Sequence, residues 1–270
     1  MRTRATLLRF RHRVLHSLPA LPALLCAAAC AQQSTEPPPA SGATPTAAAT
    51  TATTPSADPA AVGVIDRRGK GGASVFVGHM VSDFDGFKKF FEDGAEERAK
   101  AGVKGHLLTR LSDGRVVVHL FAADLGALKM TLASPGLEKY LGRPGSPDAS
   151  LIWLAYDEFI KLPAKPPTEP TFSLLLKLRA SDLPALRNGF LERQRLFADY
   201  GVIASGLHHS VDQADLVFLH FVGTDAKKLE ALSQRPEFVA WLATRGSTEA
   251  PQSFLGEDVS RSRAYYADFN

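Results

Sequence analysis

The sequence predicts an α+β protein that contains two copies of one strand–helix–strand–strand–helix–strand unit. The first observation is an internal repeat: a shift of 99 positions places residues 74–103 on residues 173–202 without a gap, and seven of these 30 positions are identical. After a two-residue insertion, a shift of 101 places residues 116–147 on residues 217–248, with eight of 32 identical. The second observation is that hydrophobic periods of two and of 3.6 residues follow in the same order in both copies, which indicates a duplicated unit.

Each copy is expected to begin with a strand and an amphipathic helix. The strands are residues 74–81 and 173–180, and Asp83 and Asp182 follow them at positions where a side-chain oxygen can cap a helix N-terminus. The apolar residues of the two helices have one-face spacing: Phe84, Phe87 and Phe91 in the first copy, and Leu183, Leu186 and Phe190 in the second.

The remaining elements follow in the same order in both copies. Gly102 and Gly201 are expected to end the first helices, because glycine adopts the left-handed C′ conformation at little cost. Asp124 and Thr224 are expected to begin the second helices. The other predicted strands are residues 103–111, 115–122 and 150–156 in the first copy and residues 202–210, 216–222 and 252–255 in the second, with Pro135 and Pro236 interrupting or restarting the second helices.

The N-terminus resembles the signal peptide of a bacterial lipoprotein. Five arginines precede the apolar stretch of residues 14–25, and the small residues 27–29 precede Cys30. This resemblance to a lipobox implies that residues 1–29 are removed and that the acylated Cys30 anchors the protein to the membrane of the bacterial envelope. Cys26 is a weaker candidate for the same role. An ordinary secretory signal and an uncleaved anchor are the alternatives, but about 12 apolar residues interrupted by proline are short for a membrane span.

Residues 30–72 are expected to form a disordered tether, because they are rich in Ala, Thr, Pro and Ser and contain few side chains that could form a core. The lipoprotein resemblance also favours the periplasmic face of the outer membrane over the inner membrane, since Ala31 and not Asp follows the cysteine. The first repeat is expected at residues 73–162 and the second at residues 172–270. The proline-rich residues 163–171 would connect them.

Composition excludes several kinds of function. Without the five arginines of the signal, the formal charge changes from +3 to 3 − 5 = −2, so the basic balance is a targeting feature and gives no reason to expect nucleic-acid binding. Both cysteines lie in the signal region, which leaves no thiol for a disulfide, a zinc site or a nucleophile in the repeats. The motifs of zinc proteases, serine hydrolases and phosphate-binding loops are absent, and Gly69–Gly72 is interpreted as part of a flexible linker. We therefore expect no metal and no cofactor.

The predicted order gives a four-stranded antiparallel sheet with both helices on one face, which is the ferredoxin-like arrangement. Residues 77–91 (VGHMVSDFDGFKKFF), 101–103 and 133–137 resemble the small dimeric α+β barrel proteins, a superfamily that includes antibiotic-biosynthesis monooxygenases, haem-degrading enzymes and cyclase-like proteins. The resemblance implies that the two repeats form within one chain the barrel that a homodimer usually forms, so we expect a monomeric pseudo-dimer. It supplies no catalytic residue, because the characteristic Asn, Trp and His sets of these enzymes are not found.

A ligand pocket is expected between the two facing sheets. Alternation along residues 173–180 places three leucines on the helix side and Lys177 and Arg179 on the interior side or the rim, where the first copy has Phe76 and Met80. The two cations could instead extend to solvent at the mouth of the barrel.

His119 and His220 are the main candidates for chemistry, because they form the only histidine pair shared by both copies and lie mid-strand between apolar residues. A neutral imidazole there could act as a base or orient a ligand carbonyl, or could be a structural side chain. His79 is expected to face the helices. His208 and His209 are adjacent and should point to opposite faces, so they do not suggest a metal site.

These observations favour a lipid-anchored envelope protein that binds a small apolar or aromatic molecule in the barrel, with the ligand contacting Phe76, Met80, His119, Lys177, Arg179 and His220. The first alternative is a cofactor-independent monooxygenase or cyclase-like enzyme with a histidine base. The second is a structural or protein-interaction module whose barrel is filled by side chains.

Overall fold

The computed structural model describes residues 58, 60, 63–133, 151–163, 165–245 and 250–262. The chain divides into two units, residues 1–52 and 53–270, and every described residue lies in the second. The predicted signal peptide, Cys30, most of the tether and Pro135 therefore lie outside the described residues.

The first half of the described chain contains the predicted elements, with the first helix divided in two at Gly94, and one short additional strand. In order they are β1 (Ile65–Asp66), β2 (Ala73–Met80), α1 (Phe84–Asp93), α2 (Ala95–Lys100), β3 (Val103–Leu111), β4 (Arg115–Ala122), α3 (Leu125–Leu132) and β5 (Leu151–Lys161). Asp83 caps α1 by accepting from Gly86 N, and Asp124 caps α3, as predicted. Gly102 ends the helical segment with φ of +94°. Residues 63–72 were assigned to the tether, but β1 pairs with β5, so this part of the predicted tether belongs to the sheet.

The second half follows the same order. It comprises β6 (Phe172–Arg179), α5 (Leu183–Glu192), α6 (Gln194–Asp199), β7 (Val202–Ser210), β8 (Leu216–Gly223), α7 (Ala226–Gln234), α8 (Pro236–Arg245) and β9 (Gln252–Arg261). Asp182 caps α5, as predicted, and Pro236 restarts the helix as α8. The prediction for α7 was wrong by one residue: Asp225, not Thr224, is the N-cap, because its carboxylate accepts from Lys227 N and Lys228 N.

Eight antiparallel strands close into a barrel in the order β5-β2-β4-β3-β9-β6-β8-β7, with β7 pairing back to β5. The last strand of each half makes the closure, because it pairs with its own half at its start and with the other half at its end. Residues 151–156 of β5 pair with β2, and residues 155–161 pair with β7. Likewise β9 pairs with β6 and then with β3. Both strands are longer than predicted, and the two expected sheets are therefore one continuous barrel.

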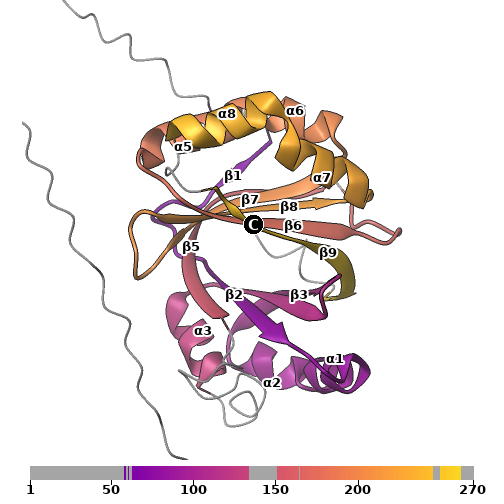
Figure 1. Ribbon diagram of the computed structural model, residues 1–270. Helices are drawn as coiled ribbons and strands as arrows, with labels where there is room; N and C mark the ends of the chain where they lie inside the picture. Colours follow the sequence, from indigo (N-terminus) through magenta and orange to yellow (C-terminus); the bar gives the residue numbers. More distant parts are fainter. Residues whose placement is uncertain are drawn as a thin grey trace, which may run out of the picture. The chain divides into compact units, whose positions relative to one another are not determined.

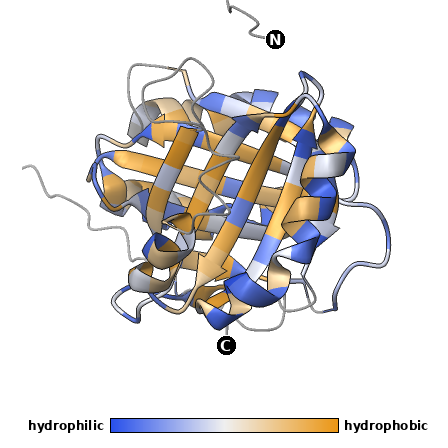
Figure 2. Cartoon of the chain, turned by 90° about the horizontal axis from the view of Figure 1, so that it is seen from below, coloured by the Kyte–Doolittle hydropathy of each residue, from blue (hydrophilic) through white to orange (hydrophobic). Residues whose placement is uncertain are grey.

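The helices of the two halves cover opposite sides of the barrel (Figure 1). Two hydrophobic clusters lie between helices and strands, one around Phe91 and Leu128 and the other around Phe190 and Phe221. Two further clusters fill the barrel, and their side chains alternate along the strands with those that face the helices. Figure 2 shows the strands as mostly hydrophobic, whereas the helices mix hydrophobic and hydrophilic residues. Among the described residues no helix is long and apolar enough to cross a membrane.

Candidate functional site

The structure places three of the six predicted ligand residues together inside the barrel. Phe76 stacks on His119 with ring centroids 4.4 Å apart and lies 6.1 Å from His220. The two histidine rings are 5.1 Å apart and nearly perpendicular, at 88°. All three side chains are buried. His119 and His220 therefore lie in the barrel interior, where the sequence placed them; their proposed contact with a ligand stays a prediction.

The other three predicted residues lie at the rim or on the surface. Met80 is 58% exposed at the end of β2. Arg179 is exposed and forms an ion pair with Asp215, with 2.7 Å between Nη1 and Oδ2. Lys177 Nζ donates to Gln252 Oε1 and lies 5.0 Å from the Trp153 ring centroid. Met80 and Arg179 do not enter the barrel, because each is the last residue of its strand; for Arg179 the rim was one of the two predicted positions.

A chain of hydrogen bonds crosses the barrel interior in the first half. Ser74 Oγ donates to Asp157 Oδ1 at 2.7 Å, and His208 Nδ1 donates to the same oxygen at 2.8 Å. Because the single Ser74 hydroxyl proton goes to Asp157, the 2.9 Å contact to His119 has Nε2–H donating to Ser74 Oγ. The serine hydroxyl thus donates its hydrogen bond to the carboxylate and not to the histidine, so it is not arranged as a nucleophile activated by a histidine base.

The second half repeats the histidine–serine–aspartate arrangement, but threonines take the place of His208 as further donors to the aspartate. His220 Nε2 contacts Ser173 Oγ at 3.2 Å, and Ser173 bonds to Asp258. Asp258 occupies the position of Asp157, but its oxygens accept from Thr109 at 2.8 Å and Thr171 at 2.7 Å. Burial is the main reason that the pKa of Asp258 is raised, although these hydrogen bonds partly oppose it.

The pKa values of His119 and His220 are lowered, which favours their neutral forms at ordinary pH. Burial lowers the pKa of His220 to about 3, with a further contribution from His208, and lowers the pKa of His119 well below its usual value. Phe218 and His208 also lie close to the Phe76 ring, at 5.4 and 5.2 Å between centroids. Since these described side chains contact one another, the interior is a packed polar and aromatic core.

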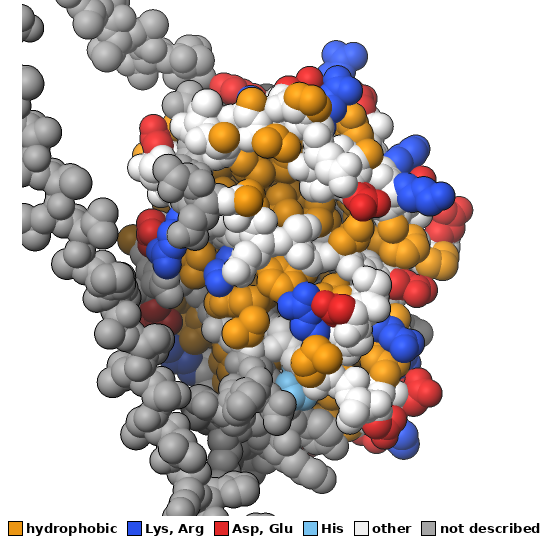
Figure 3. All heavy atoms as spheres, in the orientation of Figure 1, with side chains coloured by type: hydrophobic (Ala, Val, Ile, Leu, Met, Phe, Trp, Pro, Cys, Tyr) orange, Lys and Arg blue, Asp and Glu red, His pale blue; other side chains and the backbone are white. Residues whose placement is uncertain are grey.

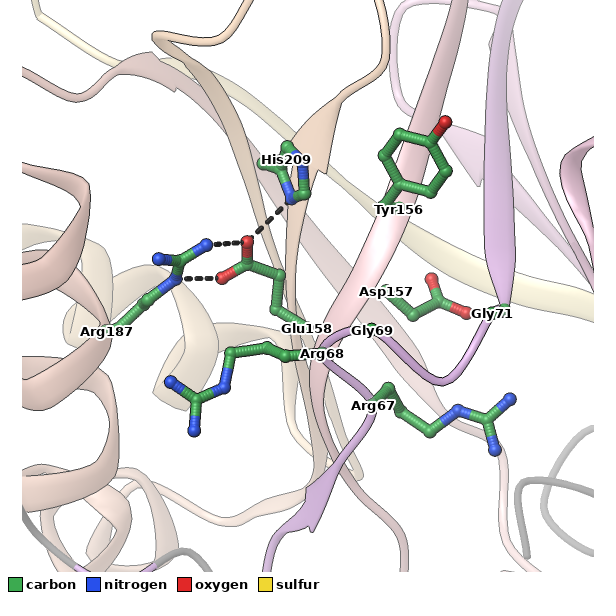
Figure 4. A pocket seen from close by; sticks show the side chains of 10 residues that line it. Arg67, Arg68, Gly69, Gly71, Tyr156, Asp157, Glu158, Arg187 and His209 are labelled. Atoms are coloured by element: carbon green, nitrogen blue, oxygen red, sulfur yellow. Dashed lines mark hydrogen bonds and ion pairs between the residues drawn. The ribbon is translucent and has the colours of Figure 1, made fainter.

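A pocket of about 340 Å³ lies outside this core, where β5 meets β7 and α5 (Figure 4). We call it the seam pocket, because β5 belongs to the first half of the chain and β7 and α5 belong to the second. It is lined by arginines, glycines, one aromatic residue and polar residues: Arg67, Arg68, Gly69, Gly71, Gly72, Tyr156, Asp157, Glu158, Arg187 and His209.

Glu158 is the most strongly bonded group of the seam pocket. Its carboxylate accepts from Nε and Nη2 of Arg187, and His209 Nδ1 lies 2.6 Å from Oε1 (Figure 4). Burial alone would raise the pKa of this carboxyl, but the hydrogen bonds from Arg187 and His209 outweigh it and hold the pKa below its ordinary value. The Tyr156 and His209 rings lie 5.3 Å apart on one side of the pocket.

The loop after β1 forms the opposite wall. Arg68 forms a bidentate pair with Asp66 and lies 4.7 Å from the Phe159 ring centroid. Gly69, Gly71 and Gly72 have φ of +68°, +72° and +92°, a conformation that only glycine adopts readily. The interpretation of Gly69–Gly72 as a flexible linker was therefore wrong: the segment is held by Gly72 N donating to Ala123 O and by Asp157 N donating to Gly72 O.

The structure contains two carboxylate–histidine contacts that no sequence motif indicated. Asp157 meets His208 inside the barrel, and Glu158 meets His209 outside it. The predicted opposite orientation of His208 and His209 is confirmed. Their partners are about 50 residues away on β5, beyond the predicted end of that strand, so no local pattern could identify them. In the described part of the chain, no group of three His, Cys, Asp or Glu side chains is placed to hold a metal ion.

Charge on the surface is mixed. Figure 3 shows lysines and arginines interspersed with carboxylates on the face that it presents, which gives no electrostatic support there for nucleic-acid binding.

Comparison with known proteins shows the fold. No protein-family model matches the chain, and no curated protein is significantly similar to it in sequence. An anthrone oxidase-like protein superposes with a TM-score of 0.53 at 14% identity, covering 75% of this chain and 97% of that protein. A proposed monooxygenase of Fusobacterium nucleatum superposes with a TM-score of 0.50 at 11% identity, covering 71% and 93%. A haem-binding protein from Thermus thermophilus covers 73% and 93% at 11% identity, with a TM-score of 0.44.

The topology and the first two similarities define the class of fold: a mixed α+β protein with a closed antiparallel barrel, of the ferredoxin-like kind found in monooxygenase-like proteins. At these identities they show the fold and not the activity.

Proposed function

We propose that this protein binds one small organic acid in the seam pocket. The observation that carries the proposal is the excess of N–H donors around the pocket. Arg68 gives one Nε and one Nη2 hydrogen bond to Asp66, and Arg187 gives the same two to Glu158. A guanidinium has five N–H donors, so within the described part of the chain three on each arginine remain for other acceptors. A carboxylate suits such donors because it accepts charge-assisted, often bidentate hydrogen bonds.

The pocket suits a small molecule with one flat side. A volume of about 340 Å³ is at the lower end of ordinary ligand pockets. The paired rings of Tyr156 and His209 offer an aromatic surface, and Tyr156 is 40% exposed. A benzoate-sized acid would place its carboxylate against the arginines and its ring against Tyr156. This proposal keeps the predicted small aromatic ligand but moves it from the barrel interior to the seam.

The two seams between the halves differ in the side chains that the structure describes there. The residues equivalent to Arg187, Glu158 and His209 are Lys88, Val259 and Arg110, and they belong to the other seam, where β9 of the second half meets β3 of the first. Lys88 pairs within its own helix with Glu92 at 2.6 Å. The equivalent seam between β9 and β3 therefore lacks the buried Glu–Arg pair that shapes the pocket.

The test is calorimetric titration of benzoate into residues 58–270. We expect saturable 1:1 binding that weakens at least tenfold in Arg68→Gln, which keeps the length of the side chain and removes the charge. Arg179→Gln is the matched control, because Arg179 is also a surface arginine paired with one aspartate but lies away from the pocket; its affinity should stay within twofold. Equal weakening by both variants, or no binding to the wild type, would exclude this function.

We further propose that the two halves arose by duplication and that the protein is held to the bacterial envelope, at the outer membrane, by acylated Cys30. The paired Ser74–His119 and Ser173–His220 contacts support the duplication, and the basic, apolar and small-residue order of residues 1–30 supports the anchor. Mass spectrometry of the mature N-terminus should find a diacylglyceryl group on Cys30. Cys30→Ala should release the protein from sedimented membranes, whereas Cys26→Ala should not.

A second candidate is a monooxygenase-like enzyme. Two observations favour it: the fold similarity to the anthrone oxidase-like protein and to the proposed monooxygenase, and the Asp157–His208 pair, in which a carboxylate orients an imidazole. Oxidation of anthrone to anthraquinone consumes one O₂ and releases one water. Oxygen uptake with anthrone that is lost in His208→Thr would support the enzyme. An unchanged rate without protein would exclude this reaction.

A further inference from the structure

One oxygen of Asp157 has no hydrogen-bond partner in the described part of the chain. Ser74 and His208 both donate to Oδ1, whereas Oδ2 is buried and accepts from none of the described groups. The side chain is 1% exposed, and Asp157 lines the seam pocket. Leaving a buried carboxylate oxygen without a donor is costly, so this oxygen requires a partner that the described chain does not supply.

The second half shows what the missing partner is. Asp258 is equivalent to Asp157, because its backbone N donates to Thr171 O as Asp157 N donates to Gly72 O. Thr171 then uses its side chain as well: Oγ1 donates to Asp258 Oδ2 at 2.7 Å. Gly72 stands in the position of Thr171 and has no side chain. Asp157 Oδ2 therefore lacks a donor among the described residues because the residue equivalent to Thr171 is a glycine, which has no hydroxyl group.

The space of the missing side chain adjoins the pocket. Gly71 and Gly72 both line the seam pocket, and in Figure 4 the Asp157 carboxylate is directed towards Gly71. A Cβ atom at Gly72 would lie 2.8 Å from Arg67 Nη2, so the end of the flexible Arg67 side chain borders this space. Gly72 has no side chain that would fill this space. A ligand group could therefore reach Asp157 by displacing the end of the Arg67 side chain.

We propose that the acid bound in the seam pocket also carries a hydrogen-bond donor, a hydroxyl group above all, which donates to Asp157 Oδ2. The ligand class is then a small hydroxy acid. Its carboxylate meets the arginines and its hydroxyl replaces the hydroxyl that Thr171 supplies in the other half. This inference rests on the proposed acid-binding function and specifies the ligand of the same site.

The test compares acids that differ only in the donor. Benzoate, 3- and 4-hydroxybenzoate, and 3- and 4-methoxybenzoate are titrated into residues 58–270. We expect one hydroxybenzoate to bind at least tenfold more tightly than benzoate and than the methoxy acid of the same ring position, because the methyl group removes the donor. Equal affinities for all acids would leave the proposed acid-binding function intact and overturn this inference. Absence of binding by every acid would overturn both.

Two variants assign the preference to one oxygen. In Asp157→Asn the preference for the hydroxy acid should fall below threefold, whereas Asp258→Asn, a buried carboxylate bonded on both oxygens and outside the pocket, should retain it. A preference that persists in Asp157→Asn overturns the inference. If that variant does not fold, a crystal structure of the wild type with the hydroxybenzoate decides, since the hydroxyl oxygen must lie within about 3 Å of Asp157 Oδ2.

Discussion

Glu158 of β5 and Arg187 of α5 form a bidentate ion pair across the boundary between the two halves of the chain. The Glu158 side chain is 1% exposed and that of Arg187 is 25% exposed. The pair lies at the point where β5 leaves its own half and joins β7. One interaction therefore links the two halves beside the point where the barrel closes and forms a wall of the seam pocket.

Removing one partner of this pair should destabilise the protein strongly. We expect Arg187→Ala to lower the free energy of unfolding by about 3 kcal/mol, because it leaves a buried carboxylate with only His209 as a side-chain partner. Urea denaturation of residues 58–270 measures this change. Lys88→Ala is the matched control on α1, where the partner Glu92 is on the same helix; about 0.5 kcal/mol or less is expected.

The double variant Glu158→Val with Arg187→Leu tests whether the ion pair stabilises the fold by its own attraction, or whether only the loss of one partner is destabilising. Valine is the natural residue at the equivalent position 259. Replacing both charges by apolar residues removes the unpaired charge, so the double variant should be more stable than Arg187→Ala by about 2 kcal/mol. If it is equally unstable, the pair contributes through its own attraction and not through avoidance of an unpaired charge.

The buried histidines should make the protein sensitive to mild acid. The pKa values of His119, His220 and His106 are all lowered in the folded state by burial, to about 3 for His220 and about 4 for His106. Below about pH 6.5 the unfolded chain therefore binds more protons than the folded chain, and stability falls as pH decreases towards about 4. Each histidine contributes up to about 1.4 kcal/mol per pH unit.

Urea denaturation at about pH 7, 6 and 5 measures this slope, in a range above the ordinary pKa values of the carboxyls. In His220→Gln, where the amide can still donate to Ser173, the slope should fall by the share of one histidine. A slope that does not change would mean that His220 is protonated in the folded protein or that it stays neutral in both states.

Local sequence signals predicted the elements well. The caps at Asp83, Asp124 and Asp182 and the left-handed Gly102 and Gly201 were identified from side-chain chemistry within a few residues of each position. Alternation along the strands also placed His119 and His220 in the interior. Each of these features depends on neighbours in the sequence, which is the range over which composition and spacing are informative.

The seam pocket could not be predicted in the same way. It depends on β5 extending past Tyr156 into the second half, and on a bulge between Asp157 and Phe159 that changes which side chains face outward. The register between β5 and β7 brings Glu158 to Arg187 and His209. Nothing in residues 63–72 indicates that their glycines cover this site. These are consequences of barrel closure, which no local pattern reports.

The interior position of His119 and His220 changes what their substitution should do. His119→Ala would leave a void beside Phe76 and remove the hydrogen bond to Ser74, so we expect a loss of about 3 kcal/mol in unfolding free energy. Benzoate affinity at the seam pocket should stay within twofold at temperatures where the variant is folded. A variant of full stability that no longer binds benzoate would instead place the ligand inside the barrel, as the sequence first suggested.

Gly206 and His208 form a pair that replaces Leu107 and Thr109 at the equivalent positions of the first half. A Cβ atom on Gly206 would overlap His208 Nε2, so the glycine makes room for the ring. We expect Gly206→Ala to cost about 2 kcal/mol through this overlap and His208→Thr to cost a similar amount through the void that it leaves.

The two changes together should cost at least about 1 kcal/mol less than their sum, because the smaller threonine removes the overlap and the alanine fills part of the void. The hydroxyl introduced by His208→Thr could also donate to Asp157, as Thr109 donates to Asp258. Urea denaturation of the two single variants and the double variant gives the coupling energy directly. Strict additivity would show that the His208 ring can move away from residue 206. The barrel interior would then be less tightly packed than the ring contacts of Phe76 indicate.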